Sequence, residues 1–150
     1  MTPTPPTGRF DGHDFLFPVR VYYEDTDLSG YVYHGTYVAF FERGRSEALR
    51  AAGLQHSALL KLEPPAVMVV RRMDIDFVRP AVIDDVLIVR SVIEDARGAR
   101  MVIRQQIERD GEVIARASLE AALISMNGGP RRFPPDVMEK LKAWIKPSTP

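Results

Sequence analysis

The chain has 150 residues, with 20 acidic side chains, 20 basic side chains and no cysteine. A chain of this length suits one domain, and it buries about 68–70% of its unfolded surface, enough for a core without cross-links. The balanced charge argues against nucleic-acid binding through bulk charge, and the lack of cysteine excludes a disulfide framework and a thiolate nucleophile.

The N-terminal segment, residues 1–14, is rich in proline, threonine and glycine and is expected to be mobile. It has no apolar core of signal-peptide length, and no stretch of the chain reaches the roughly 18 apolar residues of a membrane-spanning helix. We therefore expect a cytoplasmic protein without a membrane span. A single domain is expected over residues 15–146, followed by a polar tail over residues 147–150.

A strand, a polar loop and a helix are predicted next. Aromatic and β-branched residues predict a strand over residues 17–24, and small or apolar residues at helical spacing predict a helix over residues 34–52, ended by Gly53. The loop between them carries Asp25 and Asp27. Because a helix N-terminus presents unpaired N–H groups and partial positive charge, a carboxylate in this loop can face those donors across a gap the size of a carbonyl group.

Four β-rich runs and a short helix complete the chain. The expected strands span residues 67–78, 86–95, 100–109 and 112–125, and Pro134-Pro135 opens the helix. Asp110-Gly111 is a strong signal for a two-residue hairpin turn. One long helix with five mostly antiparallel strands is an α+β pattern, in which the helix covers one face of the sheet.

The string FPVRVYYEDTDLSGYVYHGTYVAFFERGRSEAL, residues 17–49, resembles the hotdog-fold acyl-CoA thioesterases of the 4-hydroxybenzoyl-CoA thioesterase superfamily, and within it the Tol-Pal-associated branch. The resemblance covers roughly residues 15–126. It implies a hotdog fold, a curved antiparallel sheet of about five strands wrapped around one long central helix. It also implies a homodimer or a dimer of dimers, with sheets joined edge to edge and the active site at the interface.

The activity implied by this resemblance is hydrolysis of an acyl-CoA thioester to a free carboxylic acid and CoA. No cofactor is expected, since coenzyme A is part of the substrate, and acyl carrier protein is an alternative carrier. Two other functions stay open: a hotdog hydratase acting on enoyl thioesters, and a non-catalytic binding protein associated with acyl carrier protein or the cell envelope. The acidic residue in the thioesterase loop disfavours the first, and the joint presence of Asp27, Gly30 and His34 disfavours the second.

Asp27 matches the family's catalytic carboxylate, which attacks the thioester carbonyl or acts as a base on water. The spacing alone instead favours an Asx-turn or a helix cap for this residue, and only the full motif favours catalysis. The resemblance assigns the polarisation of the carbonyl to the backbone N–H of His34, whose imidazole either orients the substrate or packs at the helix start. The three histidines are too dispersed to give a metal-ligand spacing, so no metal site is expected.

Four residues are candidates for substrate binding near the helix. Gly30 either keeps the loop open for the substrate or is an ordinary turn glycine. Tyr33 and Tyr37 either line the acyl pocket or belong to the core. Glu42 matches a position that faces the acyl group in aryl-CoA members of the superfamily, although it could pair with Arg45 on the helix.

A CoA thioesterase also needs cations for the nucleotide phosphates. Arg97 and Arg100, at the turn between two predicted strands, match the region that supplies these cations in relatives. Each could instead be a solvated surface charge, and other arginines compete for the role: Arg71, Arg72, Arg131 and Arg132.

Overall fold

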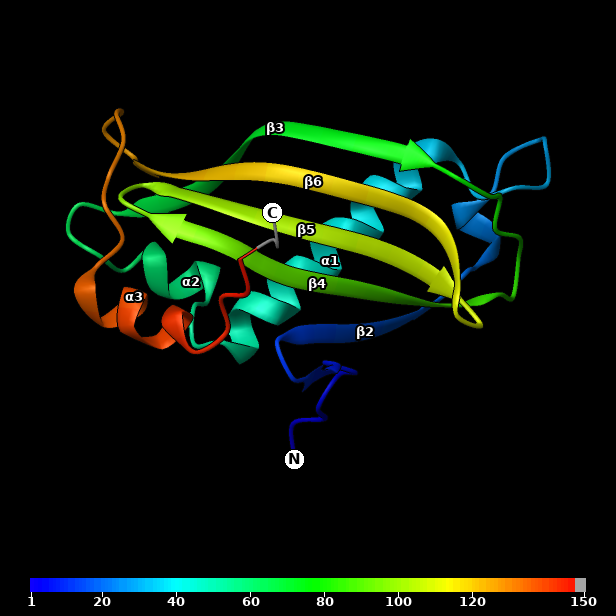
Figure 1. Cartoon of the computed structure of the whole chain (residues 1–150), viewed down its shortest axis with the longest axis horizontal. Coiled ribbons are helices and arrows are strands. Elements are labelled where there is room, and N and C mark those ends of the chain that lie inside the picture. The colour runs from blue at the N-terminus through cyan, green and yellow to red at the C-terminus, as the bar shows by residue number, and fades with distance from the viewer. Residues whose placement is uncertain (148–150) are drawn as a thin grey trace.

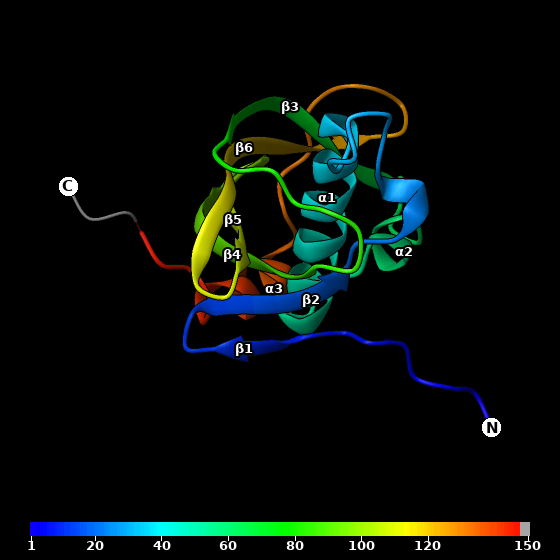
Figure 2. The ribbon, with the colours of Figure 1, turned by 90° about the vertical axis from the view of Figure 1, so that its right-hand side faces the viewer.

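A curved antiparallel sheet wraps around one long helix in the computed structural model, which describes residues 1–147 (Figures 1 and 2). The strand order is β1-β2-β4-β5-β6-β3, and all neighbouring strands are antiparallel. The sheet is open, with β1 and β3 at its edges. The α+β hotdog architecture is therefore confirmed, with six strands rather than about five.

The strands are β1 (Arg9–Asp11), β2 (Asp14–Arg20), β3 (Ala66–Phe77), β4 (Val86–Arg97), β5 (Arg100–Arg109) and β6 (Glu112–Ser125). The helices are α1 (His34–Ala51), α2 (His56–Leu59) and α3 (Pro135–Lys142), and a 3₁₀ turn spans Tyr23–Asp25. Within the described residues, no helix is both long and apolar enough to cross a membrane.

The N-terminal part of the chain differs from the prediction. Strand β1 lies within the segment expected to be mobile, and it pairs with β2. The ring of Phe10 stacks on Trp144 with a centroid distance of 3.8 Å, and it meets Phe15 edge to face. Strand β2 ends at Arg20, before the 3₁₀ turn that leads into the loop. Of the tail expected over residues 147–150, residues 148–150 lie outside the described chain.

Helix α1 packs one face against the curved sheet, as Figure 2 shows. Its buried residues are Tyr37, Phe40, Phe41, Gly44, Ala48 and Leu49. A Cβ atom at Gly44 would lie 2.4 Å from Cγ1 of Val89, so only glycine allows this close approach of helix and sheet. The helix ends as predicted, with Gly53 at a φ of 103°. This packing fixes the helix axis and, with it, the position of the helix N-terminus.

Candidate active site

The loop before α1 is a small hairpin that is held together by backbone hydrogen bonds. Thr26 pairs with Val32, the N–H of Asp27 donates to the carbonyl oxygen of Tyr31 at 3.1 Å, and that of Gly30 donates to Asp27 at 3.0 Å. Gly30 has a φ of 85°, a left-handed conformation that favours glycine. No atom lies within 4 Å of a Cβ built at this glycine, so the space beside the turn is also open.

Asp27 presents an ionised carboxylate at the edge of this loop. Its Oδ1 atom accepts hydrogen bonds from the backbone N–H of Ser29, at 2.8 Å, and from the Ser29 hydroxyl. The hydroxyl bond, followed by the backbone bond and the nearby charge of His34, lowers the pKa of Asp27 below its ordinary value. Both bonds use Oδ1, which leaves Oδ2 for chemistry. The Asx-type bond foreseen as an alternative is thus present, and it does not occupy the whole carboxylate.

The N-terminus of α1 faces the same space. The helix begins at His34, and the side chain of its N-cap residue, Tyr33, makes no capping hydrogen bond. The first N–H groups of a helix have no intrahelical acceptor, and they carry partial positive charge. These N–H groups can therefore donate hydrogen bonds to an anion or to a polarised carbonyl oxygen in this space, because the Tyr33 side chain does not accept from them.

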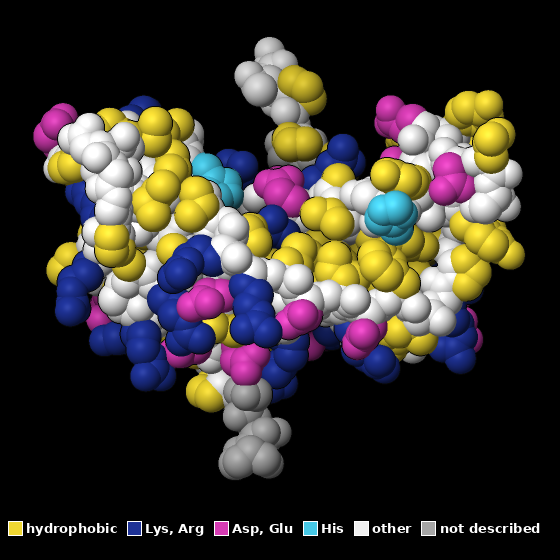
Figure 3. All heavy atoms as spheres, turned by 90° about the horizontal axis from the view of Figure 1, so that it is seen from above, with side chains coloured by type: hydrophobic (Ala, Val, Ile, Leu, Met, Phe, Trp, Pro, Cys, Tyr) yellow, Lys and Arg dark blue, Asp and Glu magenta, His cyan; other side chains and the backbone are white. Residues whose placement is uncertain are grey.

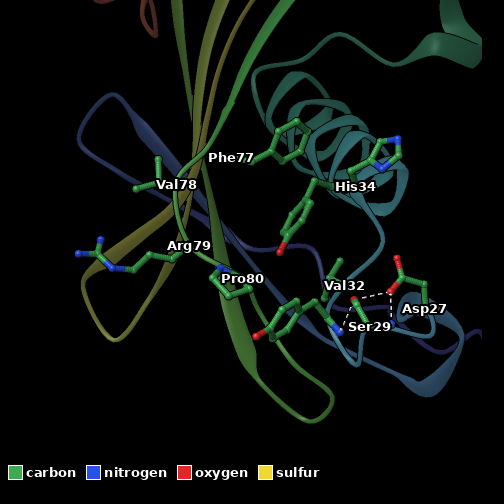
Figure 4. Close-up of a pocket in the computed structure, with 10 residues that line it drawn as sticks. Asp27, Ser29, Val32, His34, Phe77, Val78, Arg79 and Pro80 are labelled. Atoms are coloured by element: carbon green, nitrogen blue, oxygen red, sulfur yellow. Dashed lines mark hydrogen bonds between the residues drawn. The ribbon is translucent and has the colours of Figure 1, made fainter.

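Asp27 and His34 line one cavity of about 310 Å³ (Figure 4). The loop and the helix form one wall, and the segment after β3 forms the other. The lining residues are Asp27, Ser29, Tyr31, Val32, His34, Tyr37, Phe77, Val78, Arg79 and Pro80. Figure 4 shows the Asp27 carboxylate and the His34 ring on one side of the cavity, and Arg79 extending away from them on the other. The cavity thus has an acid and a helix start at one side, and a cation at the other.

The second wall is held in place by hydrogen bonds, one of them buried. The backbone N–H of Ala81 donates to the hydroxyl of Tyr37 at 3.1 Å, and this tyrosine is only 4% exposed. Burial raises the pKa of Tyr37, so the hydroxyl stays neutral. Arg109 donates to the carbonyl oxygen of Pro80 at 3.2 Å and to Asp85 at 2.8 Å. Tyr37 therefore both lines the cavity and fixes the opposite wall.

The remaining predicted residues lie apart from this cavity. Tyr33 is at the N-cap, with its ring 4.4 Å from that of His34 and 47% of the residue exposed. Glu42 lines a second cavity, further along α1. Arg97 and Arg100 are at the β4–β5 turn, at the other end of the sheet from Phe77.

Both arginines of that turn have acidic partners. Arg97 donates to Asp95 at 3.0 Å, and Arg100 bonds to Glu120. The cation that does line the cavity, Arg79, was not among the arginines predicted from the sequence to bind the phosphates.

Sequence reasoning also missed Ser29, Ser46 and His56. Ser29 could have been found from its position two residues after Asp27, where a hydroxyl residue commonly bonds to an aspartate. Ser46 and His56 meet only because α2 folds back on α1, and no spacing in the sequence signals that contact. Among the described residues, no group of His, Cys, Asp and Glu is placed to hold a metal ion.

Known proteins resemble this chain in sequence and in fold. Residues 29–115 match the thioesterase superfamily. An acyl-CoA thioesterase named YbgC from Haemophilus influenzae is 38% identical over 124 residues, which cover 82% of this chain and 90% of the relative. The acyl-CoA thioester hydrolase YbgC of Escherichia coli is 36% identical over 130 residues, covering 85% and 96% of the two chains.

Solved structures of thioesterase-like proteins are also similar to this chain. A crystal structure described as a probable thioesterase from Bartonella henselae has a TM-score of 0.76 at 45% identity, and the match covers 79% of this chain and 98% of that one. A protein from Thermus thermophilus has a TM-score of 0.81 at 22% identity over 89% of this chain and 98% of its own, which shows a shared fold.

Proposed function

The chain belongs to the thioesterase superfamily, and on that premise we propose that it hydrolyses acyl-CoA thioesters to a carboxylic acid and coenzyme A, with Asp27 as the catalytic carboxylate. One observation carries the assignment of the site: the Asp27 carboxylate and the N-terminus of α1 line the same cavity. A thioester needs a nucleophile or a base together with polarisation of its carbonyl, and this cavity offers both.

In the proposed reaction, the thioester carbonyl oxygen accepts hydrogen bonds from the N–H groups at the start of α1, the first of which belongs to His34. Oδ2 of Asp27 then either attacks the carbonyl carbon, giving a mixed anhydride that water hydrolyses, or removes a proton from an attacking water. The thiol of coenzyme A has a pKa near that of cysteine, about 8.5, so it leaves as a thiolate without a catalytic acid. The imidazole of His34 orients the thioester or the water.

The acyl end and the nucleotide end of the substrate fit opposite parts of the cavity. Val32, Phe77 and Val78 supply apolar surface beside the reacting carbon, while Gly30 shapes the loop and Tyr37 holds the far wall. Arg79 extends away from Asp27 and offers a cation for a nucleotide phosphate (Figure 4).

Arg97 and Arg100 could serve the phosphates only from a second copy of the chain, because in their own copy they lie at the other end of the sheet. We propose a homodimer that joins the sheets at β3, with a dimer of dimers as the larger alternative. Edge strand β3 is long and exposes apolar side chains, with 46% of Val70 and 52% of Phe77 accessible. A substrate of this kind, whether carried by CoA or by acyl carrier protein, suggests a cytoplasmic enzyme, and the likeness to the Tol-Pal-associated branch suggests an envelope-linked role.

Thiol release from a panel of thioesters tests this function. We expect hydrolysis of at least one among short, medium, long and aromatic acyl-CoAs, and the same acyl groups on acyl carrier protein identify the preferred carrier. An enoyl-CoA in the panel, followed by the loss of its conjugated absorbance, detects a hydratase. A folded protein that releases thiol from none of these substrates would refute the proposal, and hydration without hydrolysis would replace it.

A further inference from the structure

The segment that forms the second wall of the active-site cavity, residues 78–85, crosses one end of the sheet; we call it the wall segment. It connects β3 to β4, and β6 and β5 lie between these two strands in the sheet. Neighbouring strands are about 4.8 Å apart, so the crossing spans roughly 14 Å. Figure 1 shows it in green beyond the arrowhead of β3. The wall segment contains no helix or strand of its own, so its path depends on its contacts.

Apolar burial does little to hold this end of the molecule. Of the wall segment, only Ala81 is buried, and the exposed hydrophobic residues here include Leu28, Tyr31, Val82 and Ile83. Figure 3 shows hydrophobic side chains (yellow) beside acidic ones (magenta) at its right-hand end, where the loop before α1 and the wall segment lie. A region with few buried apolar contacts opens locally at low cost unless polar contacts hold it.

Arg109, the last residue of β5, supplies such contacts. Its Nη1 atom donates to the carbonyl oxygen of Pro80 at 3.2 Å and to Oδ2 of Asp85 at 2.8 Å. The same Oδ2 atom accepts the backbone N–H of Val82 at 2.9 Å. The side chains of Arg109 and Asp85 are only 27% and 19% exposed, so this ion pair is less screened by solvent than an ordinary surface pair. One nitrogen therefore holds the wall segment at two points.

The turn that contains Asp85 needs this support. The N–H of Asp85 donates to the carbonyl oxygen of Val82 at 3.1 Å, and Asp84 has a φ of 70°. Residues other than glycine seldom adopt this left-handed conformation, and it persists only where the surrounding contacts determine it. Two hydrogen bonds of 2.9 Å join Asp84 and Asp85 to the backbone of Val21 on one side, and Arg109 holds Asp85 on the other.

The wall segment is in turn bonded to the loop that carries the catalytic carboxylate. The N–H of Val32 donates to the carbonyl oxygen of Ala81 at 2.9 Å, and Tyr31 forms an antiparallel bridge with Val82. The carbonyl oxygen of Tyr31 accepts the N–H of Asp27 at 3.1 Å. A shift of the wall segment therefore also moves the backbone of Asp27.

Arg109 does not line the cavity, so its loss removes no contact with the substrate. Tyr37, by contrast, lines the cavity and holds the wall from the substrate side. We propose that Arg109 is a positioning residue for the proposed hydrolysis: together with Asp85 it fixes the wall segment, and the wall segment fixes Asp27 opposite the start of α1. This inference rests on the proposed thioesterase activity, and it assigns the effect of Arg109 to kcat rather than to KM.

Arg109→Met tests this role in steady-state kinetics, because methionine keeps an unbranched side chain and removes both contacts. We expect kcat to fall by about tenfold to a hundredfold, the loss that a displacement of about 1 Å causes at reacting groups. KM for acyl-CoA should stay within about threefold of the wild-type value. Arg104→Met is the matched control on the same strand: Arg104 is 41% exposed and lies 4.0 Å from Glu94, so kcat should change by less than about twofold.

Two further variants separate positioning from general stability. Both contacts of Arg109 come from one nitrogen, so the ammonium group of Arg109→Lys can replace them, and we expect kcat to return to within about fivefold of the wild type. In the Asp27→Asn background, Arg109→Met should lower the remaining kcat by less than about twofold. Residues that act through one another have non-additive effects, and the carboxylate to be positioned is then already gone.

Hydrogen exchange measures the same link without any substrate. In Arg109→Met, the backbone N–H groups of Asp27 and Val32 should exchange at least about tenfold faster than in the wild type, because their acceptors belong to the loop and the wall segment. The N–H of Leu49, within α1, should keep its rate, and Arg104→Met should change none of the three.

The possible results separate this inference from the function beneath it. An unchanged kcat in folded Arg109→Met, with a lower Tm alone, would give Arg109 a purely structural role and overturn the proposal. A rise in KM for acyl-CoA but not for an acyl-pantetheine would place Arg109 on a substrate phosphate and would also overturn it. If the wild type released no thiol at all, the thioesterase function would fail, while unchanged exchange at Asp27 and Val32 would show that Arg109 does not hold the loop.

Discussion

Replacing Tyr37 with phenylalanine should weaken the fold and the substrate site together. The Tyr37 hydroxyl accepts the backbone N–H of Ala81 at 3.1 Å, and Ala81 is fully buried. Phenylalanine keeps the ring and leaves this N–H without a partner, which costs about 1–3 kcal/mol. For a chain of this size, each kcal/mol lowers Tm by about 2–4 °C, so we expect a fall of about 2–12 °C.

The assay compares thermal unfolding and kinetics at one protein concentration. Because Ala81 follows Pro80 in the wall of the cavity, Tyr37→Phe should raise KM for acyl-CoA more than it lowers kcat. Tyr33→Phe is the matched control, since Tyr33 is 47% exposed and loss of its hydroxyl should change stability by less than about 0.5 kcal/mol. An unchanged Tm for Tyr37→Phe would refute the claim that this hydrogen bond holds the wall.

Three further changes test other parts of the account. Gly44→Ala should lower the free energy of unfolding by about 1–3 kcal/mol in urea, because its Cβ would lie 2.4 Å from Val89, and a second change, Val89→Ala, should recover part of that loss. Ser29→Ala removes the hydroxyl bond that lowers the pKa of Asp27. The acid limb of kcat/KM, where this carboxylate becomes protonated, should therefore move to higher pH. Arg79→Ala should raise KM for acyl-CoA, because it removes a charged contact of about 1.5–3 kcal/mol with a phosphate. KM for an acyl-pantetheine, which lacks the nucleotide, should change far less. An equal rise in KM for both substrates would contradict a phosphate contact.

Local signals in the sequence were enough to predict most of the helices and strands, while the resemblance to the thioesterases supplied the hotdog arrangement. Asp110 and Gly111 have φ angles of 51° and 80°, as the predicted two-residue hairpin requires. Gly53 ends α1 as expected. Strand β1 was not foreseen, because it is stabilised by the stacking of Phe10 on Trp144, a contact between residues at opposite ends of the chain.

Only part of the candidate site could be predicted from the sequence. Asp27 and His34 are seven residues apart in one loop and helix start, so a sequence motif could bring them together. The opposite wall, which contains Phe77 and Arg79, comes from a distant segment whose approach depends on the curvature of the sheet. The contact of Ser46 with the α2 histidine depends on how two helices fold back on each other, and the sequence carries no spacing that marks it.

The central claim is that the carboxylate of Asp27 performs the chemistry, and Asp27→Asn tests it most directly. Asparagine keeps the volume of the side chain and removes its charge. We measure kcat for the best acyl-CoA and, in the same preparation, Kd for CoA and the thermal unfolding curve. The account predicts that kcat falls by at least about 10²-fold while CoA binding and Tm stay close to those of the wild type. Turnover near the wild-type value in the folded variant would contradict it.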